Sequence, residues 1–367
     1  NPKVFLLTCC VISALVSLLV GSSWTTIATI GIALVGIGQS QGFEPHWIAG
    51  AVISGAYFGD KISPLSDTTI LASSSAGAEL FPHIRYMLIT TVPAFVISLL
   101  IFLVVGFRTT AADDSMIADF LQALQGSFNI SPWLLIVPLL TGLLIAFRWP
   151  ALITLFFSMM FAVVAMLLTQ PHVIQIITYS NGLSFADGFV ASFKAIYGHV
   201  AIDTGNDMLN TLVTTRGMTG MLNTIWLVIS AVCFGGVMLG SGMIHSITQM
   251  IIRHIRRRAA VVSSTVFTGV FCNICLADQY LSIILTNSLF KDFYEKKGYE
   301  ARLLSRSTED SATVTGVLIP WNSCGMTQAT ILNVATLSYL PYCFFNILSP
   351  IMSIVVAVVG YKIRVRN

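Results

Sequence analysis

Long stretches without charged residues constrain this chain more than any other feature of its sequence. No Asp, Glu, Lys or Arg occurs between Lys3 and Glu44, or between Asp310 and Lys362. Four more uncharged stretches lie between these two, at 86–107, 120–147, 149–186 and 217–252. A helix that crosses a bilayer needs about 20 mainly apolar residues, and each stretch can hold at least one such helix. The sequence therefore predicts an all-α polytopic membrane protein.

Composition excludes the other broad classes of protein. Only 10% of the 367 residues are Asp, Glu, Lys or Arg, and 55% are apolar. A soluble domain carries about 25% charged residues, so a soluble globular fold is excluded. The number of apolar stretches also excludes a cleaved signal peptide or a single anchor. The net charge of +3 gives no indication of nucleic-acid binding, because the basic residues lie at the ends of the apolar stretches.

The chain has weak internal symmetry at a constant offset of 250 residues. Residues 9–39 overlay 259–289, and residues 47–79 overlay 297–329, with few identities. Both series run from an uncharged stretch through a short loop and an interrupted polar segment to a final apolar helix. Secondary transporters are commonly built from internal repeats whose broken helices meet at the midplane of the membrane. The sequence predicts two inverted-topology repeats, each with a re-entrant hairpin and a broken transmembrane helix.

Basic residues predict the orientation, because basic loops face the cytoplasm. The arginines at 253–258 and the basic C-terminus at 362–366 are therefore both expected inside. Three apolar stretches separate them, which is consistent only if 259–290 is a hairpin that enters and leaves from the cytoplasm. By the same symmetry, 9–39 is a hairpin entered from outside and 47–79 is a broken helix that runs inward.

Three parts of the chain follow from this scheme. Residues 1–107 form the first repeat, and residues 259–367 form the second repeat with a cytoplasmic tail. Residues 108–258 lie between them. They contain an acidic outer loop at 113–119 and an interfacial segment at 170–220. Scaffold helices are expected at 132–147, 149–169 and 221–244. The second repeat has three crossings before its hairpin and the first has almost none, so we expect further N-terminal helices, on the order of 100 residues.

The motif GDKISPLSDTT at 59–69 predicts a broken helix with oxygen ligands. Pro64 removes a backbone N–H and clashes with the preceding turn, so the helix should break there. Asp60 and Asp67 lie on one helix face, about 10 Å apart. Carboxylate, hydroxyl and free carbonyl oxygens are the ligands that a small hard cation prefers. The alternative is that Lys61 neutralises one aspartate in a structural ion pair.

The second repeat carries a matching segment, SRSTEDSATVT at 305–315 followed by IPWNSCG at 319–325. Asp310 coincides with Asp60 under the offset. Ionisable groups inside a membrane are costly and usually functional. A buried carboxyl can hold a proton or release it to hold Na⁺, and that competition would be an exchange. We therefore expect Na⁺ in the region of Asp60, Asp67 and Asp310.

The tips of the two predicted hairpins, GSSWTTIAT at 21–29 and NICLADQ at 273–279, supply further candidate ligands. Small-residue helix packing is the alternative for the first tip, and an ion pair of Asp278 with Arg302 or Arg306 is the alternative for the second. The expected ion and proton ligands are Asp60, Asp67, Asp278, Glu309 and Asp310. The expected supporting ligands are Ser22, Ser23, Thr25, Thr26, Ser63, Ser66, Thr68, Thr69, Ser311, Thr313, Thr315 and Asn322. The six histidines lie near the ends of predicted segments and receive no role.

These motifs, together with LADQYLSIIL at 276–285, resemble those of the NhaC family of Na⁺/H⁺ antiporters from about residue 5 to 360. The resemblance implies exchange of Na⁺ for H⁺ in a bacterial inner membrane, with no cofactor. It also implies that the five acids above are the charged residues of the transport region. The family usually has Asn after SDTT, where this chain has Ile70, which puts a strict Na⁺/H⁺ stoichiometry in question.

Two alternatives stay open at this point. The NhaC family includes exchangers of malate for lactate, so an organic anion or amino acid is a second substrate class, favoured if Arg85, Arg302 or Arg306 lies at the midplane. An intramembrane aspartyl protease is remote, since Tyr57 stands where its Gly-x-Gly-Asp motif needs Gly. We expect a transporter and no enzyme, with the bilayer, Na⁺ and H⁺ as partners and a homodimer left open.

Overall fold

The computed structural model describes residues 2–108, 114–147, 149, 151–180, 184–215, 217–253 and 258–361. Within these ranges the chain is helical and forms no β-sheet, and one isolated antiparallel bridge joins Val200 and Thr215. The predicted all-α fold class is confirmed. Several residues that fixed the predicted topology lie outside the described ranges, namely Asp113, Arg148, Arg256, Arg257, Lys362, Arg364 and Arg366.

The described helices include enough apolar spans for a polytopic membrane protein. Four are long and apolar enough to cross a membrane, namely Pro2–Val20, Leu80–Arg108, Gly217–Gly240 and Ala259–Leu276. Three bent pairs raise the number to as many as seven if each pair is one span, namely Ala118–Ser127 with Pro132–Leu144, Ile153–Thr169 with Pro171–Thr178, and Thr336–Tyr342 with Phe344–Val359. The pairs bend by 89°, 99° and 56° respectively.

The chain divides into two compact units. The first contains Asn1–Gly38, Phe43–Thr110 and Thr224–Asn367, and the second contains Gln39–Gly42 and Ala111–Asn223. The boundaries expected from the sequence, after residues 107 and 258, stay predictions. All the candidate ion ligands belong to the first unit.

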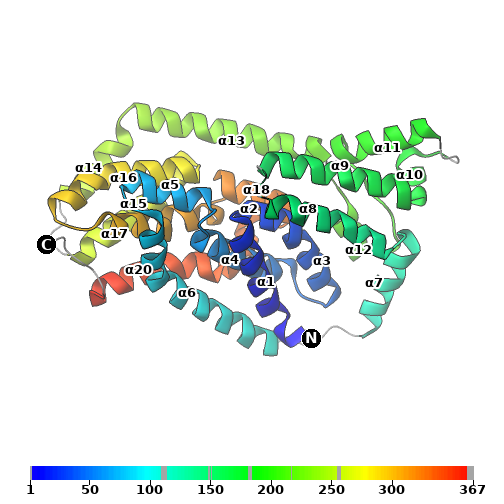
Figure 1. Cartoon of the computed structure of the whole chain (residues 1–367), viewed down its shortest axis with the longest axis horizontal. Coiled ribbons are helices and arrows are strands. Elements are labelled where there is room, and N and C mark those ends of the chain that lie inside the picture. Colours follow the sequence, from blue (N-terminus) through cyan, green and yellow to red (C-terminus); the bar gives the residue numbers. More distant parts are fainter. Residues whose placement is uncertain are drawn as a thin grey trace. The chain divides into compact units, whose positions relative to one another are not determined.

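The N-terminal part of the first unit is a helical hairpin followed by a broken helix and a long single helix, coloured dark blue to cyan in Figure 1. Its elements are η1 (Pro2–Val4), α1 (Phe5–Val20), α2 (Ser23–Thr26), the π-helical turn η2 (Ile27–Gly31), α3 (Ile32–Ser40), α4 (Pro45–Ile62), α5 (Asp67–Ala76) and α6 (Leu80–Arg108).

The hairpin turns at Gly21, which has a φ of +70° that other residues rarely adopt. Ser22 then caps α2 by accepting a hydrogen bond from the backbone N–H of Thr25 at 3.2 Å. At the open end, the rings of Phe5 and Phe43 stack with their centroids 5.5 Å apart. The chain therefore returns to the end from which it started, as the hairpin predicted at 9–39 requires.

Helix α1 packs directly on the backbone of α4 through two glycines. A Cβ on Gly55 would lie 2.0 Å from the carbonyl oxygen of Cys10, and one on Gly59 would lie 2.1 Å from that of Ala14. Such close approach is typical of membrane helices that meet at small residues. It holds the last turn of α4, with Asp60 and Lys61, against the hairpin.

The break predicted at Pro64 is present. Helix α4 ends at Ile62 and α5 begins at Asp67. Ser66 caps α5 by accepting a hydrogen bond from the backbone N–H of Thr69 at 3.4 Å. The second half of the broken helix therefore starts with its own cap rather than as a continuation of the first.

The C-terminal part of the first unit repeats this order of elements, in yellow to red in Figure 1. Its elements are α14 (Met243–Arg253), α15 (Arg258–Leu276), α16 (Gln279–Lys296), α17 (Ala301–Thr308), the π-helical turn η4 (Glu309–Thr313), η5 (Gly316–Leu318), α18 (Ser323–Leu332), α19 (Thr336–Tyr339), η6 (Leu340–Tyr342) and α20 (Phe344–Val359).

The second hairpin, α15 and α16, turns at Ala277, a non-glycine residue with a φ of +55°. A hydrogen bond between the hydroxyls of Thr265 and Tyr294, at 2.9 Å, joins its two arms. The following helix breaks before α18, which Asn322 caps by accepting from the backbone N–H of Cys324 at 3.0 Å. A helical hairpin and a broken helix are thus both found in this part, whereas the re-entrant course of the hairpin in the membrane stays a prediction.

Each half-helix after a break packs on the hairpin of the other series. Asn287 of α16 donates hydrogen bonds to the Ala72 carbonyl (3.0 Å) and the Ser75 hydroxyl (2.7 Å) of α5. In the same way Leu332 of α18 packs against Gly31 of η2. Figure 1 shows α5 beside α16. The order of elements agrees with a repeat, whereas the opposed orientation of the two repeats in the membrane stays a prediction.

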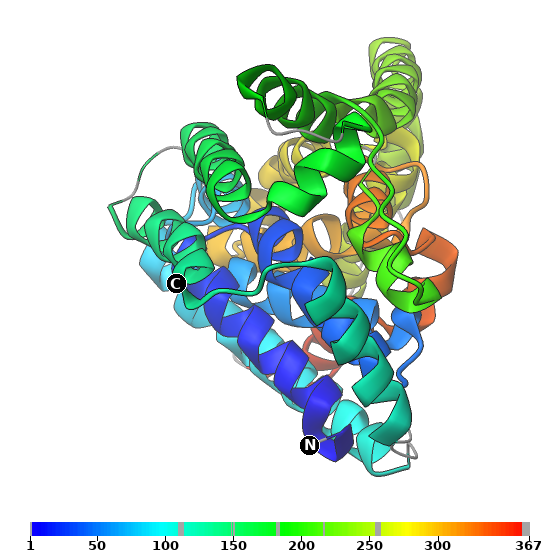
Figure 2. The ribbon, with the colours of Figure 1, turned by 90° about the vertical axis from the view of Figure 1, so that its right-hand side faces the viewer.

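The second unit contains the helices drawn in turquoise to green in Figure 2. They are α7 (Asp114–Ser127), η3 (Pro132–Leu135), α8 (Ile136–Ala146), α9 (Ala151–Thr169), α10 (Pro171–Thr178), α11 (Phe185–Tyr197) and α12 (Asp207–Val213), and α13 (Gly217–Gly240) leads into the first unit. Helices α8 and α9 pack side by side, as do α10 and α11. This unit has its own small core and contains none of the candidate ligands.

Candidate functional site

A buried ion pair joins the two series of elements at the centre of the site. The ammonium of Lys61, on α4, bonds to Oδ1 of Asp310, on η4, and both side chains are fully buried. Thr90 of α6 donates to the same oxygen at 3.1 Å, and the Ser349 hydroxyl of α20 lies 3.3 Å from it. A buried ion pair persists only when further hydrogen bonds satisfy its charges. Here those bonds come from two additional helices.

This pair decides the alternative left open for Lys61. The lysine does neutralise an aspartate, but its partner is Asp310 of the other series and not Asp60 beside it. The ammonium also donates to Ser349 at 2.9 Å and lies over the ring of Phe345, 5.8 Å from its centroid. The pair therefore ties α4 to the second broken helix.

Asp60 connects the first break to the tip of the first hairpin. Its Oδ2 accepts a hydrogen bond from the Ser23 hydroxyl at 2.8 Å, whereas Oδ1 is buried without a hydrogen-bond partner among the described residues. A second bond, from the Ser63 hydroxyl to the Leu18 carbonyl at 2.8 Å, joins the break to the end of α1. The first hairpin tip therefore docks on the first break.

The second hairpin tip docks on the second break in the same manner. Asn273 donates to the Ala312 carbonyl at 2.6 Å and to the Thr315 hydroxyl at 3.0 Å. Asn322 donates back to the Asn273 carbonyl at 3.1 Å. Asn273 was not among the predicted ligands, although the offset that relates Asp60 to Asp310 relates Ser23 to Asn273.

Glu309 and Arg306 are the least satisfied side chains of the site. Both are fully buried, and neither the two Glu309 oxygens nor the three Arg306 nitrogens have a hydrogen-bond partner among the described residues. The Arg306 guanidinium lies over the ring of Tyr86, 4.5 Å from its centroid, a cation–π contact. Its Nε is 4.0 Å from Oδ2 of Asp310. Buried polar groups normally find partners, so these atoms indicate a place for water, protons or ions.

The remaining two predicted acids lie at the edge of the site. Asp67 is exposed and accepts a hydrogen bond from the Tyr280 hydroxyl at 2.7 Å. Asp278 is half-buried and caps α16, accepting from the backbone N–H of Leu281 at 3.0 Å and from the Ser323 hydroxyl at 3.2 Å. The alternative in which Asp278 pairs with an arginine is wrong, since the ion pairs of the described arginines go to Glu300 and Asp310.

Most of the predicted supporting ligands already make hydrogen bonds. The hydroxyls or amides engaged in them belong to Ser22, Ser23, Thr25, Thr26, Ser63, Ser66, Thr68, Thr69, Ser311, Thr315 and Asn322. Thr313 is buried with a hydroxyl that has no partner among the described residues. A hydroxyl that donates to a carbonyl still offers a lone pair to a cation, so these contacts are compatible with ligation.

The structure does not bring Asp60, Asp67 and Asp310 into one cluster. Among the described residues, no three His, Cys, Asp or Glu side chains are arranged to hold a metal ion. Instead, Asp60 faces the first hairpin tip, Asp310 faces Lys61, and Asp67 lies at the surface. The Na⁺ site therefore stays a prediction. Among the described residues, the acids with a buried oxygen that has no hydrogen-bond partner are Asp60 (Oδ1), Asp310 (Oδ2) and Glu309 (both oxygens).

Comparison with known proteins gives the family. A model described as the Na⁺/H⁺ antiporter family matches residues 1–89 and 55–361. The chain belongs to this Na⁺/H⁺ antiporter family. Its family is thus one of membrane transporters, and the resemblance noted in the motifs is confirmed.

Individual relatives align over nearly the whole chain. The Na(+)/H(+) antiporter NhaC of Alkalihalophilus pseudofirmus is 36% identical, over 98% of this chain and 75% of that protein. The Na(+)/H(+) antiporter NhaC of Bacillus subtilis is 33% identical, over 98% of this chain and 77% of that protein. The Malate-2H(+)/Na(+)-lactate antiporter of Bacillus subtilis is also 33% identical, over 98% of this chain and 74% of that protein.

Removing one partner of the Lys61–Asp310 ion pair should strongly destabilise the protein, because the other charge stays buried. Replacing Lys61→Met leaves the Asp310 carboxylate buried without its counter-charge, which costs about 3–5 kcal/mol. We expect a clear fall in the thermal unfolding temperature of the purified protein in detergent, partly restored in the double variant Lys61→Met/Asp310→Asn. Glu44→Gln, which removes an exposed carboxylate, is the control. An unchanged unfolding temperature for Lys61→Met would contradict the structural role of the pair.

Proposed function

We propose that the protein exchanges Na⁺ for H⁺ across the membrane. The observation that carries the proposal is the buried carboxylates of Asp60 and Glu309, whose open oxygens lie beside the two helix breaks. Membership of the Na⁺/H⁺ antiporter family supports the same function.

The proposed exchange follows from the cost of burying a carboxylate. A charged oxygen without a partner is unfavourable in an apolar environment, so it must take up a proton or a cation. Asp60 has the Ser23 hydroxyl as a neighbouring oxygen, and carboxylate and hydroxyl oxygens suit Na⁺. Glu309 stands in the π-helical turn η4, ahead of the second break and directly before Asp310 in the sequence. A proton and Na⁺ then compete for these acids, and binding of one releases the other.

Alternate exposure of the acids to the two sides needs a movement of the elements that hold them. The tip of each hairpin contacts the break of the helix that follows it. A few hydrogen bonds form these contacts, with donors from Ser23, Ser63, Asn273 and Asn322. We infer that this assembly moves as a body, in an elevator-like or rocking motion, because α5 and α18 tie each series to the hairpin of the other.

Removing the negative charge of Asp60 or of Asp310 should stop the exchange of Na⁺ for H⁺. In everted vesicles that contain the full-length protein, Asp60→Asn and Asp310→Asn should reduce Na⁺-dependent proton movement to the level of vesicles without the protein. Asp60→Asn removes a proposed cation ligand, and Asp310→Asn removes the carboxylate that pairs with Lys61. Glu44→Gln, far along α4 from the break, should transport normally. Intact Na⁺-dependent proton movement in both Asn variants would refute the mechanism.

A second candidate function is exchange of an organic anion coupled to these ions. The observation in its favour is Arg306, whose guanidinium is buried next to Asp310 and has no hydrogen-bond partner among the described residues. A guanidinium binds a carboxylate through two parallel hydrogen bonds. By contrast, Arg85 is exposed and Arg302 is paired with Glu300. One relative is named as a malate and lactate antiporter.

Uptake of an organic acid distinguishes the two functions. If the second function holds, proteoliposomes with an imposed Na⁺ or proton gradient should take up radiolabelled malate or lactate. Arg306→Lys should then lose that uptake, because an ammonium cannot make the paired hydrogen bonds. Proton movement driven by Na⁺ without uptake of either acid would leave Na⁺/H⁺ exchange as the function.

We also propose that the protein lies in the bacterial inner membrane with its C-terminus in the cytoplasm. Single cysteines placed at 113–119 and at 253–258, in a background without the natural cysteines, should react with an impermeant maleimide from opposite sides. The basic segment should be labelled only from the cytoplasmic side, because cytoplasmic loops carry the excess of Lys and Arg. Labelling of both segments from the same side would overturn this topology.

A further inference from the structure

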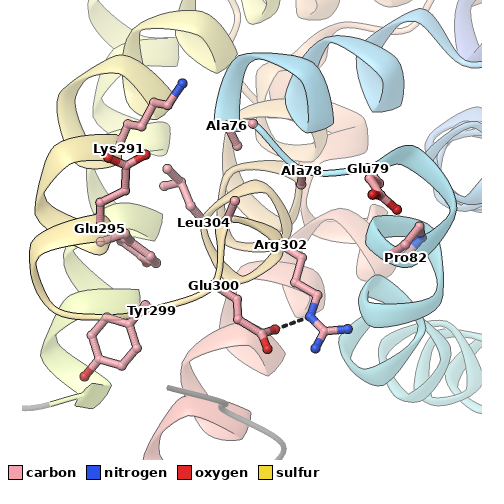
Figure 3. A pocket seen from close by; sticks show the side chains of 13 residues that line it. Ala76, Ala78, Glu79, Pro82, Lys291, Glu295, Tyr299, Glu300, Arg302 and Leu304 are labelled. Carbon is pink, nitrogen blue, oxygen red and sulfur yellow. Dashed lines mark hydrogen bonds and ion pairs between the residues drawn. The ribbon is translucent and has the colours of Figure 1, made fainter. Parts of the chain in front are cut away.

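A pocket of about 520 Å³ lies where the base of the second hairpin meets the beginning of α6, and Figure 3 shows the side chains that surround it. Glu79 and Pro82 come from the N-terminal segment, and Glu295, Glu300 and Arg302 come from the other series. Seven of the twelve residues 291–302 are charged, so this end of the hairpin belongs in water. The pocket is therefore an aqueous opening at one end of the site.

A buried histidine stands directly behind the wall of this pocket. Pro82 and Leu304 line the pocket, and the residues that follow them, His83 and Ser305, are fully buried and hydrogen-bonded to each other. The bond joins His83 Nδ1 and Ser305 Oγ at 2.6 Å. The other ring nitrogen, Nε2, is buried without a hydrogen-bond partner among the described residues. No role follows for this histidine from the sequence, where it lies at the edge of an apolar stretch.

The charged side chains around His83 come from three elements. Lys61 of α4 and Asp310 of η4 interact electrostatically with His83. Arg302 and Arg306 of α17 lie over the ring of Tyr86, three residues further along α6. Helices α1 and α20 also pack against α6 but contain no Asp, Glu, Lys, Arg or His, whereas η1 and α5, which pack against it as well, contain Lys3 and Asp67. His83 is thus the ionisable side chain that lies behind the wall of the pocket, on the side of the charged cluster.

Buried polar atoms without hydrogen-bond partners lie between His83 and the acids Glu309 and Asp310. Thr90, seven residues further along α6 and so about 10 Å away, donates to Asp310. Between the two, Arg306 covers the ring of Tyr86, and its nitrogens lack hydrogen-bond partners, as do Oδ2 of Asp310 and both oxygens of Glu309. Buried polar atoms of this kind are normally satisfied by ordered water, and a file of water conducts protons.

We propose that His83 and Ser305 relay protons between this pocket and the buried acids of the site. A proton taken up at one ring nitrogen is matched by loss of the proton on the other, so the imidazole returns to its neutral form. The Ser305 hydroxyl exchanges its own proton with Nδ1, and water in the pocket supplies or accepts the proton at the outer end. The relay rests on the proposed Na⁺/H⁺ exchange and makes His83 a proton-transfer residue that does not bind Na⁺.

The test separates proton-coupled transport from transport of Na⁺ alone. Proteoliposomes that contain the full-length protein are assayed for Na⁺-driven proton movement and for exchange of ²²Na⁺ against Na⁺ in the absence of a pH gradient. His83→Asn keeps a hydrogen-bonding group near Ser305 but cannot titrate, so Na⁺/H⁺ exchange should fall by about tenfold or more. Exchange of ²²Na⁺ against Na⁺ and the half-saturating Na⁺ concentration should not change.

Two more variants make the result decisive. Ser305→Ala should reproduce the selective loss, and it replaces His83→Asn if that variant does not fold. His172→Asn, at an exposed histidine of α10, should behave as wild type. Unchanged Na⁺/H⁺ exchange in both relay variants, or an equal loss of both transport modes, would overturn the relay. If the unaltered protein moves no protons with Na⁺, the proposed function fails and the relay fails with it, whereas normal exchange in the unaltered protein and in both relay variants overturns the relay alone.

Discussion

The ion pair between Lys61 and Asp310 is the contact on which the rest of the site depends. It lies between residues 249 positions apart and is surrounded by Thr90 and Ser349 from two further helices. Charges buried in an apolar environment are stable only as a satisfied set. The pair and its hydrogen bonds therefore join four helical elements, namely α4, α6, η4 and α20.

The two hairpins depend on the helices that this ion pair joins. Each hairpin tip forms hydrogen bonds with one helix break, through Ser23 in the first series and Asn273 in the second. Each half-helix after a break packs on the opposite hairpin. Neither series can thus complete its polar contacts without the other. This mutual dependence explains why a lipid-embedded chain tolerates two interrupted helices, since protein and not lipid surrounds the freed backbone groups.

Local features of the sequence predicted local structure well. The break at Pro64 and the two hairpins follow from backbone chemistry that acts over a few residues. Contacts between side chains far apart in the sequence could not be predicted. The spacing of apolar residues indicates a helix but does not show which side chains of two helices contact each other. Asp310 seemed equivalent to Asp60, yet only Asp310 pairs with Lys61. Asp278 seemed a buried ligand but caps a helix, and His83 received no role because burial at a helix end has no signature in a single sequence.

The balance of buried charge gives a reason for exchange between two monovalent cations. Among the described residues, the buried Asp, Glu, Lys and Arg side chains of the site are three acids and two bases, namely Asp60, Glu309, Asp310, Lys61 and Arg306. With every group ionised, the site carries one excess negative charge, which an apolar environment disfavours. One proton or one Na⁺ removes that excess, and a second cation would create the opposite one. Na⁺ and H⁺ therefore compete to neutralise the same excess negative charge, even where they bind to different oxygens.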